Sequence, residues 1–399
     1  MKAQVDSRIN PFRFGGDLGA DELVDRVEET ALVESTIRNG EKLFLIGPRR
    51  FGKTSILRSA DENLTAAGAV VLRLDAEAYP TIEMLVSKIV TIAASRLKGK
   101  VDLGIEQISK FFSRLKPEIK YSGVDQELSV SIGVDSSAEQ NRPVRLLVDA
   151  LDGLEAMALS QPRSRPVGLI IDEFQAVVAR GGIEAEAQIR ASIQKHRRVG
   201  YVLAGSQTRI MTDMTMRHER PLYRLGTNRF IGALPVDEFS AHLLKNFRRF
   251  GFVVANAAPI QSILDSAEQV PFNVQMLAHY CWEDLRSQGG CKPPILTTQV
   301  VESALRRTVN GLDPWYTEAW TRLTTIQQKA LLVVIQRKGA GMNSSEAARS
   351  IGLGVSSLQS AIRGLQDQNI LRDDPVAGRI NLRFVDPYFP FWIKMVVIR

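Results

Sequence analysis

The 399-residue sequence has few cysteines and no long apolar segment, and both absences limit what the protein can be. Cys281 and Cys291 are too few for a disulfide framework and lack the spacing of a zinc site. No apolar run approaches the roughly 18 residues that span a bilayer, and residues 1–6 lack the apolar core of a signal peptide. We therefore expect a cytoplasmic protein without disulfides or membrane contact. Paired zinc-ligand spacing is also missing from the dispersed histidines, which are His196, His218, His242 and His279.

The positive charge is concentrated near the end of the sequence. The formal net charge is +7, and residues 321–399 hold 11 Lys and Arg against 5 Asp and Glu, which accounts for +6 of it. Such clustering is typical of a surface that binds nucleic acid. A solvated basic face has the same composition, so both interpretations stay open.

The first part of the chain has the pattern of a parallel α/β sheet. An apolar run at 43–46, a glycine-rich segment, a helical pattern at 55–67 and a second apolar run at 69–72 together predict a βαβ unit. Further apolar runs at 167–171 and 200–204 predict fully buried parallel strands. We expect residues 1–234 to form one α/β core, with alternation near 117–134 predicting an inserted β-hairpin.

Helices dominate the remainder of the sequence. Amphipathic patterns such as those at 237–250 and 258–269 predict a helical lid over residues 235–312. Residues 313–399 then predict a winged helix-turn-helix domain. Its expected helices and strands are 325–337, 344–351, 356–367, 370–372 and 379–384, with a turn at 374–378 between the strands.

The glycine-rich segment matches the phosphate-binding loop in full. Gly47 and Gly52 let the backbone bend so that its N–H groups face a phosphate, and the following helix adds a favourable dipole. Lys53 is expected to bridge the β- and γ-phosphates of ATP, while the Thr54 hydroxyl ligates Mg²⁺. The residues expected to bind Mg·ATP here are Gly47, Pro48, Arg49, Arg50, Phe51, Gly52, Lys53, Thr54 and Ser55.

Two later strands are predicted to end in catalytic groups. The run at 167–171 is followed by Asp172, the expected metal partner, and by Glu173, the expected base that orients water. The run at 200–204 is followed by Ser206 and Gln207 at the carboxyl edge of the sheet, where they are expected to sense the γ-phosphate. After that strand comes an arginine cluster in which any member can be a transition-state finger or a surface residue: Arg217, Arg220, Arg224 and Arg229.

The motifs together resemble the archaeal-type ATPase family, a branch of P-loop ATPases related to AAA+ and STAND proteins. The resemblance is carried by the loop at 47–55, by residues 171–175 and by Gly205-Ser206-Gln207. Residues 10–12 and 23–28 resemble the family's adenine-side segment, and residues 386–392 resemble its ending after the wing. The resemblance implies an AAA+-like sheet flanked by helices, with a helical lid closing on the nucleotide and a C-terminal winged helix.

The resemblance also implies three further site residues. Arg26 is expected on the adenine side, Pro271 in the lid, and Arg224 at the phosphate-contacting position. The family pattern Pro-Leu-Tyr-Gly-Arg is changed here, since Arg224 directly follows Tyr223. The pattern Gly-Gly-x-Pro is changed to Glu268-Gln269-Val270-Pro271.

Three functions fit these residues. The first is a slow ATPase that acts as a nucleotide-controlled switch, binding DNA through its winged helix and open to ATP-dependent self-association. The second is a signalling or defence-type ATPase whose C-terminal domain binds a protein partner, because the predicted recognition helix at 356–367 has Arg363 as its one arginine. The third is a nucleotide-binding scaffold without turnover, which Lys53, Thr54, Asp172 and Glu173 argue against.

Overall fold

The computed structural model describes residues 9–16, 26–96, 109–115, 117–121, 128–132, 142–288, 293–376 and 379–398. The chain forms two compact units, one of Asp17–Gly232 and one of Met1–Gly16 with Ala233–Arg399. The sequence-based division into residues 1–234, 235–312 and 313–399 stays a prediction. Cys291 and residues 23–25 lie outside the described residues.

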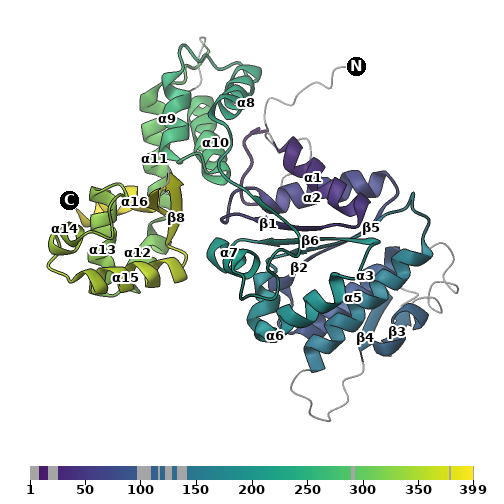
Figure 1. The fold of residues 1–399 in the computed structure, drawn as a ribbon. Helices are drawn as coiled ribbons and strands as arrows, with labels where there is room; N and C mark the ends of the chain where they lie inside the picture. The colour runs from purple at the N-terminus through teal and green to yellow at the C-terminus, as the bar shows by residue number, and fades with distance from the viewer. Residues whose placement is uncertain are drawn as a thin grey trace. The chain divides into compact units, whose positions relative to one another are not determined.

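The first unit is built on a five-stranded parallel sheet (Figure 1). Its strand order is β2-β5-β6-β1-β7. The three central strands β1, β5 and β6 are almost entirely buried, as expected for apolar runs covered on both faces. The expected P-loop fold class is confirmed. The strand bounds are Lys42–Ile46 for β1, Val70–Asp75 for β2, Val167–Asp172 for β5, Val199–Gly205 for β6 and Thr227–Phe230 for β7.

Helices cover both faces of this sheet. Helices α1 (Val27–Asn39) and α2 (Lys53–Ala66) lie on one face, and α3 (Ile82–Arg96), α5 (Arg142–Ser160) and α6 (Gln175–Ile193) lie on the other (Figure 1). Glycine lets α1 approach closely, because a Cβ atom on Gly200 would lie 2.4 Å from the Cα atom of Ile37. This first unit also contains the antiparallel pair β3 (Pro117–Tyr121) and β4 (Leu128–Ile132), the short helices Ala76–Ala78 and Ser113–Leu115, and α7 (Thr208–Met216).

The second unit begins with a helical group. Its members are α8 (Val236–Arg249), α9 (Ala258–Ser266), α10 (Pro271–Ser287) and α11 (Thr298–Gly311). Residues 9–16 pack into this group, since the Phe12 ring is fully buried 4.7 Å from the Phe247 ring. The Asn10 amide also donates to the carbonyl of His279 at 3.1 Å. None of the described helices of the protein is long and apolar enough to cross a bilayer.

The end of the chain forms the expected winged helix. A capping box between Thr324 and Gln327 starts its first helix. Strand β8 runs to Val376, so the turn predicted at 374–378 is wrong for residues 374–376, because Asp374 still pairs with Asn381 of β9. The elements are α12 (Asp313–Thr321), α13 (Thr325–Gln336), α14 (Ser345–Arg349), α15 (Val355–Asp367), β8 (Leu371–Val376), β9 (Arg379–Phe384), α16 (Phe389–Trp392) and a π-helix at Ile393–Val397.

Side-chain contacts join the winged helix to the helical group. The Tyr388 hydroxyl donates to the Asn273 carbonyl at 2.6 Å, and the Asn273 amide donates to Asp386 at 3.2 Å. Arg383 of β9 forms an ion pair with Glu268, which precedes α10, at 3.2 Å. The wing is therefore tied to the loop that leads into α10.

Candidate functional site

The phosphate-binding motif at residues 47–54 runs from the end of β1 into the first turn of α2, at the carboxyl edge of the sheet. Gly47 is needed where the loop passes Ile231, the residue after β7, because a Cβ atom there would lie 2.7 Å from the Ile231 carbonyl oxygen. Gly52 is the N-cap of α2 and has φ +87°, and among the described residues no side chain caps this terminus. The first backbone N–H groups of α2 are thus suited to an anionic ligand.

Lys53 is the first residue of α2 and is almost completely buried. Its side chain is 5% exposed, and Nζ donates to the Pro48 carbonyl at 3.0 Å. Burial lowers the pKa of Lys53, while the nearby carboxylates of Glu173 and Asp172 act against that shift. The ammonium group therefore lies inside the loop and close to both acidic residues.

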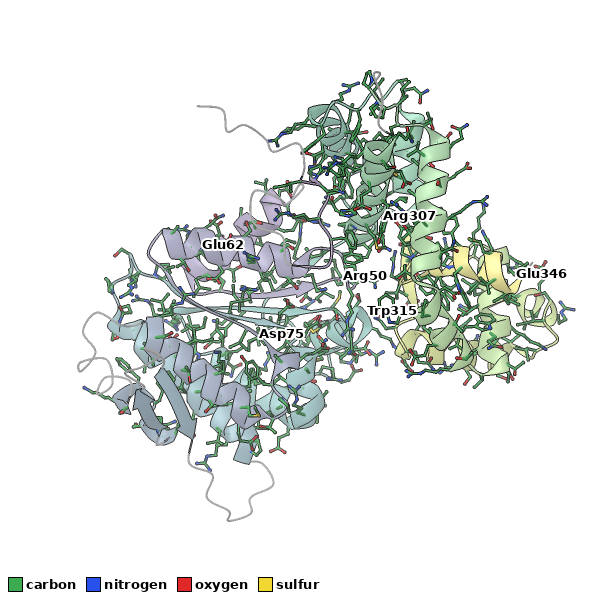
Figure 2. The ribbon with its side chains drawn as sticks, turned by 180° about the vertical axis from the view of Figure 1, so that it is seen from behind. Arg50, Glu62, Asp75, Arg307, Trp315 and Glu346 are labelled. Carbon is green, nitrogen blue, oxygen red and sulfur yellow. The ribbon has the colours of Figure 1, made fainter. Side chains whose placement is uncertain are left out.

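Thr54 and Asp172 meet although 118 residues separate them in the sequence. The Thr54 hydroxyl donates to Asp172 Oδ2 at 2.8 Å, and the Glu173 backbone N–H donates to Oδ1 at 3.0 Å. Burial raises the pKa of Asp172, which is 6% exposed, and the Thr54 hydrogen bond partly offsets this. Asp75, labelled in Figure 2, is the register partner of Asp172 at the ends of β2 and β5.

This donor set fits Mg²⁺, which prefers hydroxyl, carboxylate and phosphate oxygens. Within the described part of the chain, no three His, Cys, Asp or Glu residues gather to hold a metal. A magnesium ion at Thr54 and Asp172 would accordingly take its remaining ligands from phosphate and water.

Glu173 has a constrained backbone and side chain. Its φ of +51° is in the left-handed region. Oε2 accepts hydrogen bonds from the Ser206 backbone at 3.0 Å, the Ser206 hydroxyl at 2.7 Å and the Gln175 amide at 2.6 Å. Burial acts to raise the pKa of Glu173, but the bonds from Gln175 and Ser206 and the charge of Lys53 outweigh it, so the pKa is lowered.

Of the two predicted sensor residues, Ser206 belongs to this cluster. Ser206 is buried and also accepts a bond of 3.4 Å from Arg49 Nε, and Arg49 pairs with Glu77 at 3.1 Å. Gln207 has an exposed side chain at the N-cap of α7. Its predicted contact with phosphate or water stays a prediction.

Three members of the arginine cluster form ion pairs within the first unit. Their partners are Asp213 for Arg217 at 2.9 Å, the fully buried Glu186 for Arg220, and Glu29 for Arg229 at 3.1 Å. Arg224 is exposed, with its guanidinium 5.1 Å from the centre of the Tyr223 ring. Among the described residues, Arg224 is the member of the cluster that has no ion pair, and its predicted contact with phosphate stays a prediction.

The remaining predicted ligand residues are placed as follows. Arg26 is buried and donates from Nη2 to the Gly232 carbonyl at 2.5 Å and to the Phe51 carbonyl at 3.5 Å, so it ties the loop to the end of the sheet. Phe51 and Ser55 are buried beside Lys53, and Arg50, also labelled in Figure 2, has φ +70°. Pro271 is the first residue of α10 and belongs to the other unit.

Left-handed backbone occurs where the resembled family has glycine. Arg224 has φ +54° at the glycine position of Pro-Leu-Tyr-Gly-Arg. Glu268 and Gln269 have φ +47° and +57° at the two glycines before Pro271. The backbone geometry is thus compatible with the family pattern although the side chains differ.

Gln175 is a residue of the site that the sequence analysis did not assign. Its position two residues after Glu173 was part of the recognised motif, but nothing in that spacing specified a contact between the side chains. The hydrogen bond depends on the left-handed turn at Glu173.

Solved structures are similar to this chain over nearly its whole length. The Walker-type ATPase PABY2304 of Pyrococcus abyssi is 17% identical with a TM-score of 0.61, covering 96% of this chain and 99% of that chain. The Aeropyrum pernix ORC2 protein in ADPNP-ADP complexes is 14% identical with a TM-score of 0.53, covering 97% and 98%. No family model and no curated protein sequence matches. At these identities the likeness shows the fold, a P-loop α/β core followed by a helical part and a winged helix.

Proposed function

We propose that this protein is an ATPase that binds Mg·ATP at the loop of residues 47–54 and acts as a slow nucleotide-controlled switch in the cytoplasm. The observation that carries the proposal is the contact between Thr54 and Asp172 at 2.8 Å, with the buried Lys53 ammonium beside it. A hydroxyl and a carboxylate that meet next to a phosphate-binding loop provide the protein ligands of a P-loop magnesium site.

Each residue then has a defined task in hydrolysis. The backbone N–H groups of the loop and Lys53 hold the β- and γ-phosphates, and Thr54 and Asp172 would hold Mg²⁺, which neutralises charge on the phosphates when bound. Glu173 orients a water whose oxygen bonds to the γ-phosphorus. The bond from that phosphorus to the β–γ bridging oxygen breaks, ADP leaves, and a proton of the water passes to Glu173 Oε1.

The lowered pKa of Glu173 suits this role at neutral pH. A base must be ionised before it accepts a proton, and the hydrogen bonds to Oε2 keep the carboxylate in that form. The same hydrogen bonds therefore leave Glu173 ready to accept a proton from the attacking water.

The winged helix suggests DNA as the partner of the switch. Helix α15 presents Ser356, Ser357, Ser360 and Arg363 as exposed residues, and small polar groups with one arginine are able to approach phosphates and base edges. The ORC2 likeness supports a nucleotide-binding protein of this architecture, since that protein was solved in ADPNP-ADP complexes. DNA binding and its coupling to ATP belong to this proposal.

A protein partner is the second candidate, and the wing favours it. Arg383 forms ion pairs with Asp374 and Glu268, and Arg372 is half-buried beside Asp374 at 3.7 Å. These two arginines are therefore less available to DNA phosphates than arginines without an acidic partner would be. The side chain of Arg379, the third wing arginine, lies outside the described residues.

The test measures ATP hydrolysis by the full chain with and without duplex DNA, together with DNA affinity at several salt concentrations. ATP hydrolysis that requires magnesium supports the ATPase proposal, and a DNA affinity that falls steeply with salt supports the DNA partner. Hydrolysis without salt-dependent DNA binding favours the protein partner. Tight ATP binding without any hydrolysis would leave the nucleotide-binding scaffold as the remaining function. Size-exclusion chromatography with ATP tests self-association.

A further inference from the structure

The Gln175 side chain is enclosed between Glu173 and the end of β6. Gln175 is the first residue of α6 and is 3% exposed. Its amide nitrogen lies 2.6 Å from Glu173 Oε2. The space for its amide oxygen exists because residue 205 is glycine, since a Cβ atom there would lie 2.5 Å from Gln175 Oε1.

The two ends of the amide differ in their surroundings. Gln175 Oε1 is buried and has no hydrogen-bond partner among the described residues. Exchanging the two ends of the amide would place its oxygen against the Glu173 carboxylate, which accepts but does not donate when ionised. A leucine or methionine at this position would avoid the unpaired oxygen. Stability alone therefore does not explain a glutamine here.

The hydrogen bond from Gln175 holds one carboxylate oxygen of Glu173, Oε2, and does not involve the other, Oε1. Among the described residues, the hydrogen bonds made to the Glu173 carboxylate all end on Oε2. The main chain is fixed as well, because the Phe174 N–H donates to the Ala204 carbonyl at 2.8 Å and the Ala176 N–H donates to the Glu173 carbonyl at 2.9 Å. The rotation of the carboxylate is thus set, and Oε1 is left to accept a hydrogen bond from water.

We propose that Gln175 is a positioning residue for hydrolysis, which holds Glu173 through Oε2 so that Oε1 receives the proton of the attacking water. This inference rests on the proposed ATPase function. Gln175 does not touch ATP in this role, so its loss changes turnover and leaves ATP binding intact.

The experiment compares Gln175→Leu with Gln188→Leu in the full chain. Gln188 lies in α6 beyond the break in the helix at Gly182, is partly exposed and donates to Glu184 instead of Glu173, so it serves as a control. Single-turnover hydrolysis by Gln175→Leu is expected to be about 10- to 100-fold slower, from the loss of one hydrogen bond to a charged group. ATP affinity is expected within threefold of wild type, so that the loss falls on the rate of hydrolysis and not on binding. The double variant Gln175→Leu/Glu173→Gln is expected to be no slower than Glu173→Gln alone.

A second readout does not depend on hydrolysis. The carbon-13 NMR signal of the Glu173 side-chain carboxyl, assigned by comparison with Glu173→Gln, is expected to shift at fixed neutral pH in Gln175→Leu, which loses a hydrogen bond to Oε2, and to stay in place in Gln188→Leu. Gln175→Leu is also expected to unfold at no lower temperature than wild type, whereas the loss of an amide with a purely structural role would lower the unfolding temperature. Wild-type turnover with an unchanged Glu173 signal overturns the proposal. A wild-type protein that binds but never hydrolyses ATP overturns the ATPase proposal, and the Glu173 signal still decides whether Gln175 holds Glu173.

Discussion

Replacing Lys53 by methionine removes one positive charge from the phosphate-binding loop and keeps an unbranched side chain of similar length. In the nucleotide-free protein, Lys53 Nζ donates to the Pro48 carbonyl, and burial lowers the pKa of Lys53. A pKa that falls on folding means that the charged amine disfavours the folded state at neutral pH. The nucleotide-free Lys53→Met variant is therefore expected to be at least as stable as wild type.

The loss in ATP affinity follows from the contacts that Lys53 would make. A hydrogen bond to a charged group contributes about 1.5–3 kcal/mol, so contacts with two phosphates contribute about 3–6 kcal/mol. The bond to the Pro48 carbonyl is given up on binding, which removes about 1 kcal/mol of that gain. The net loss of about 2–5 kcal/mol corresponds to roughly 30- to 5,000-fold weaker binding.

Isothermal titration calorimetry with a non-hydrolysable ATP analogue and magnesium measures this change. Lys42→Met is the matched control, because Lys42 is also partly buried with a lowered pKa and donates to the carbonyls of His196 and Gly40, at the opposite end of β1. By the same argument this control is expected to be at least as stable as wild type, and it is expected to keep ATP affinity. If Lys53→Met binds the analogue within threefold of wild type, the placement of the phosphates against Lys53 is wrong.

Three further predictions test the metal, the base and the wing. Glu173→Gln is expected to keep ATP affinity and lower turnover about 10²- to 10⁴-fold, and steady-state phosphate release at the wild-type rate would reject Glu173 as the base. Burial raises the pKa of Asp172, so its charge destabilises the fold at neutral pH. Urea unfolding without nucleotide is therefore expected to show that Asp172→Asn is more stable than wild type. The ATP binding of this variant is expected to lose its dependence on magnesium. Arg379→Ala is expected to flatten the salt dependence of DNA binding by about one unit. Arg383→Ala, which loses ion pairs with Asp374 and Glu268, is expected to change that slope less, and an equal change would show that Arg383 leaves those partners to bind DNA.

The sequence was most informative where the signal is local. The helix predicted at 325–337 is observed at Thr325–Gln336, and the one predicted at 356–367 is observed at Val355–Asp367. Apolar periodicity and capping residues act over a few positions, so they can be read directly. Strand β7 was not predicted, because Thr227-Asn228-Arg229-Phe230 has no apolar run and forms a strand by pairing with β1 at the sheet edge.

For the site, the sequence by itself determined which residue types are present and at which edge of the sheet they lie. A loop after one buried strand and two carboxylates after another must meet there, because parallel strands end at a common edge. The partners were decided by tertiary structure, as with Glu186 for Arg220, Glu268 for Arg383 and Gln175 for Glu173. The first two join residues distant in sequence, and the third requires a left-handed turn, so packing and backbone geometry select these contacts rather than local pattern.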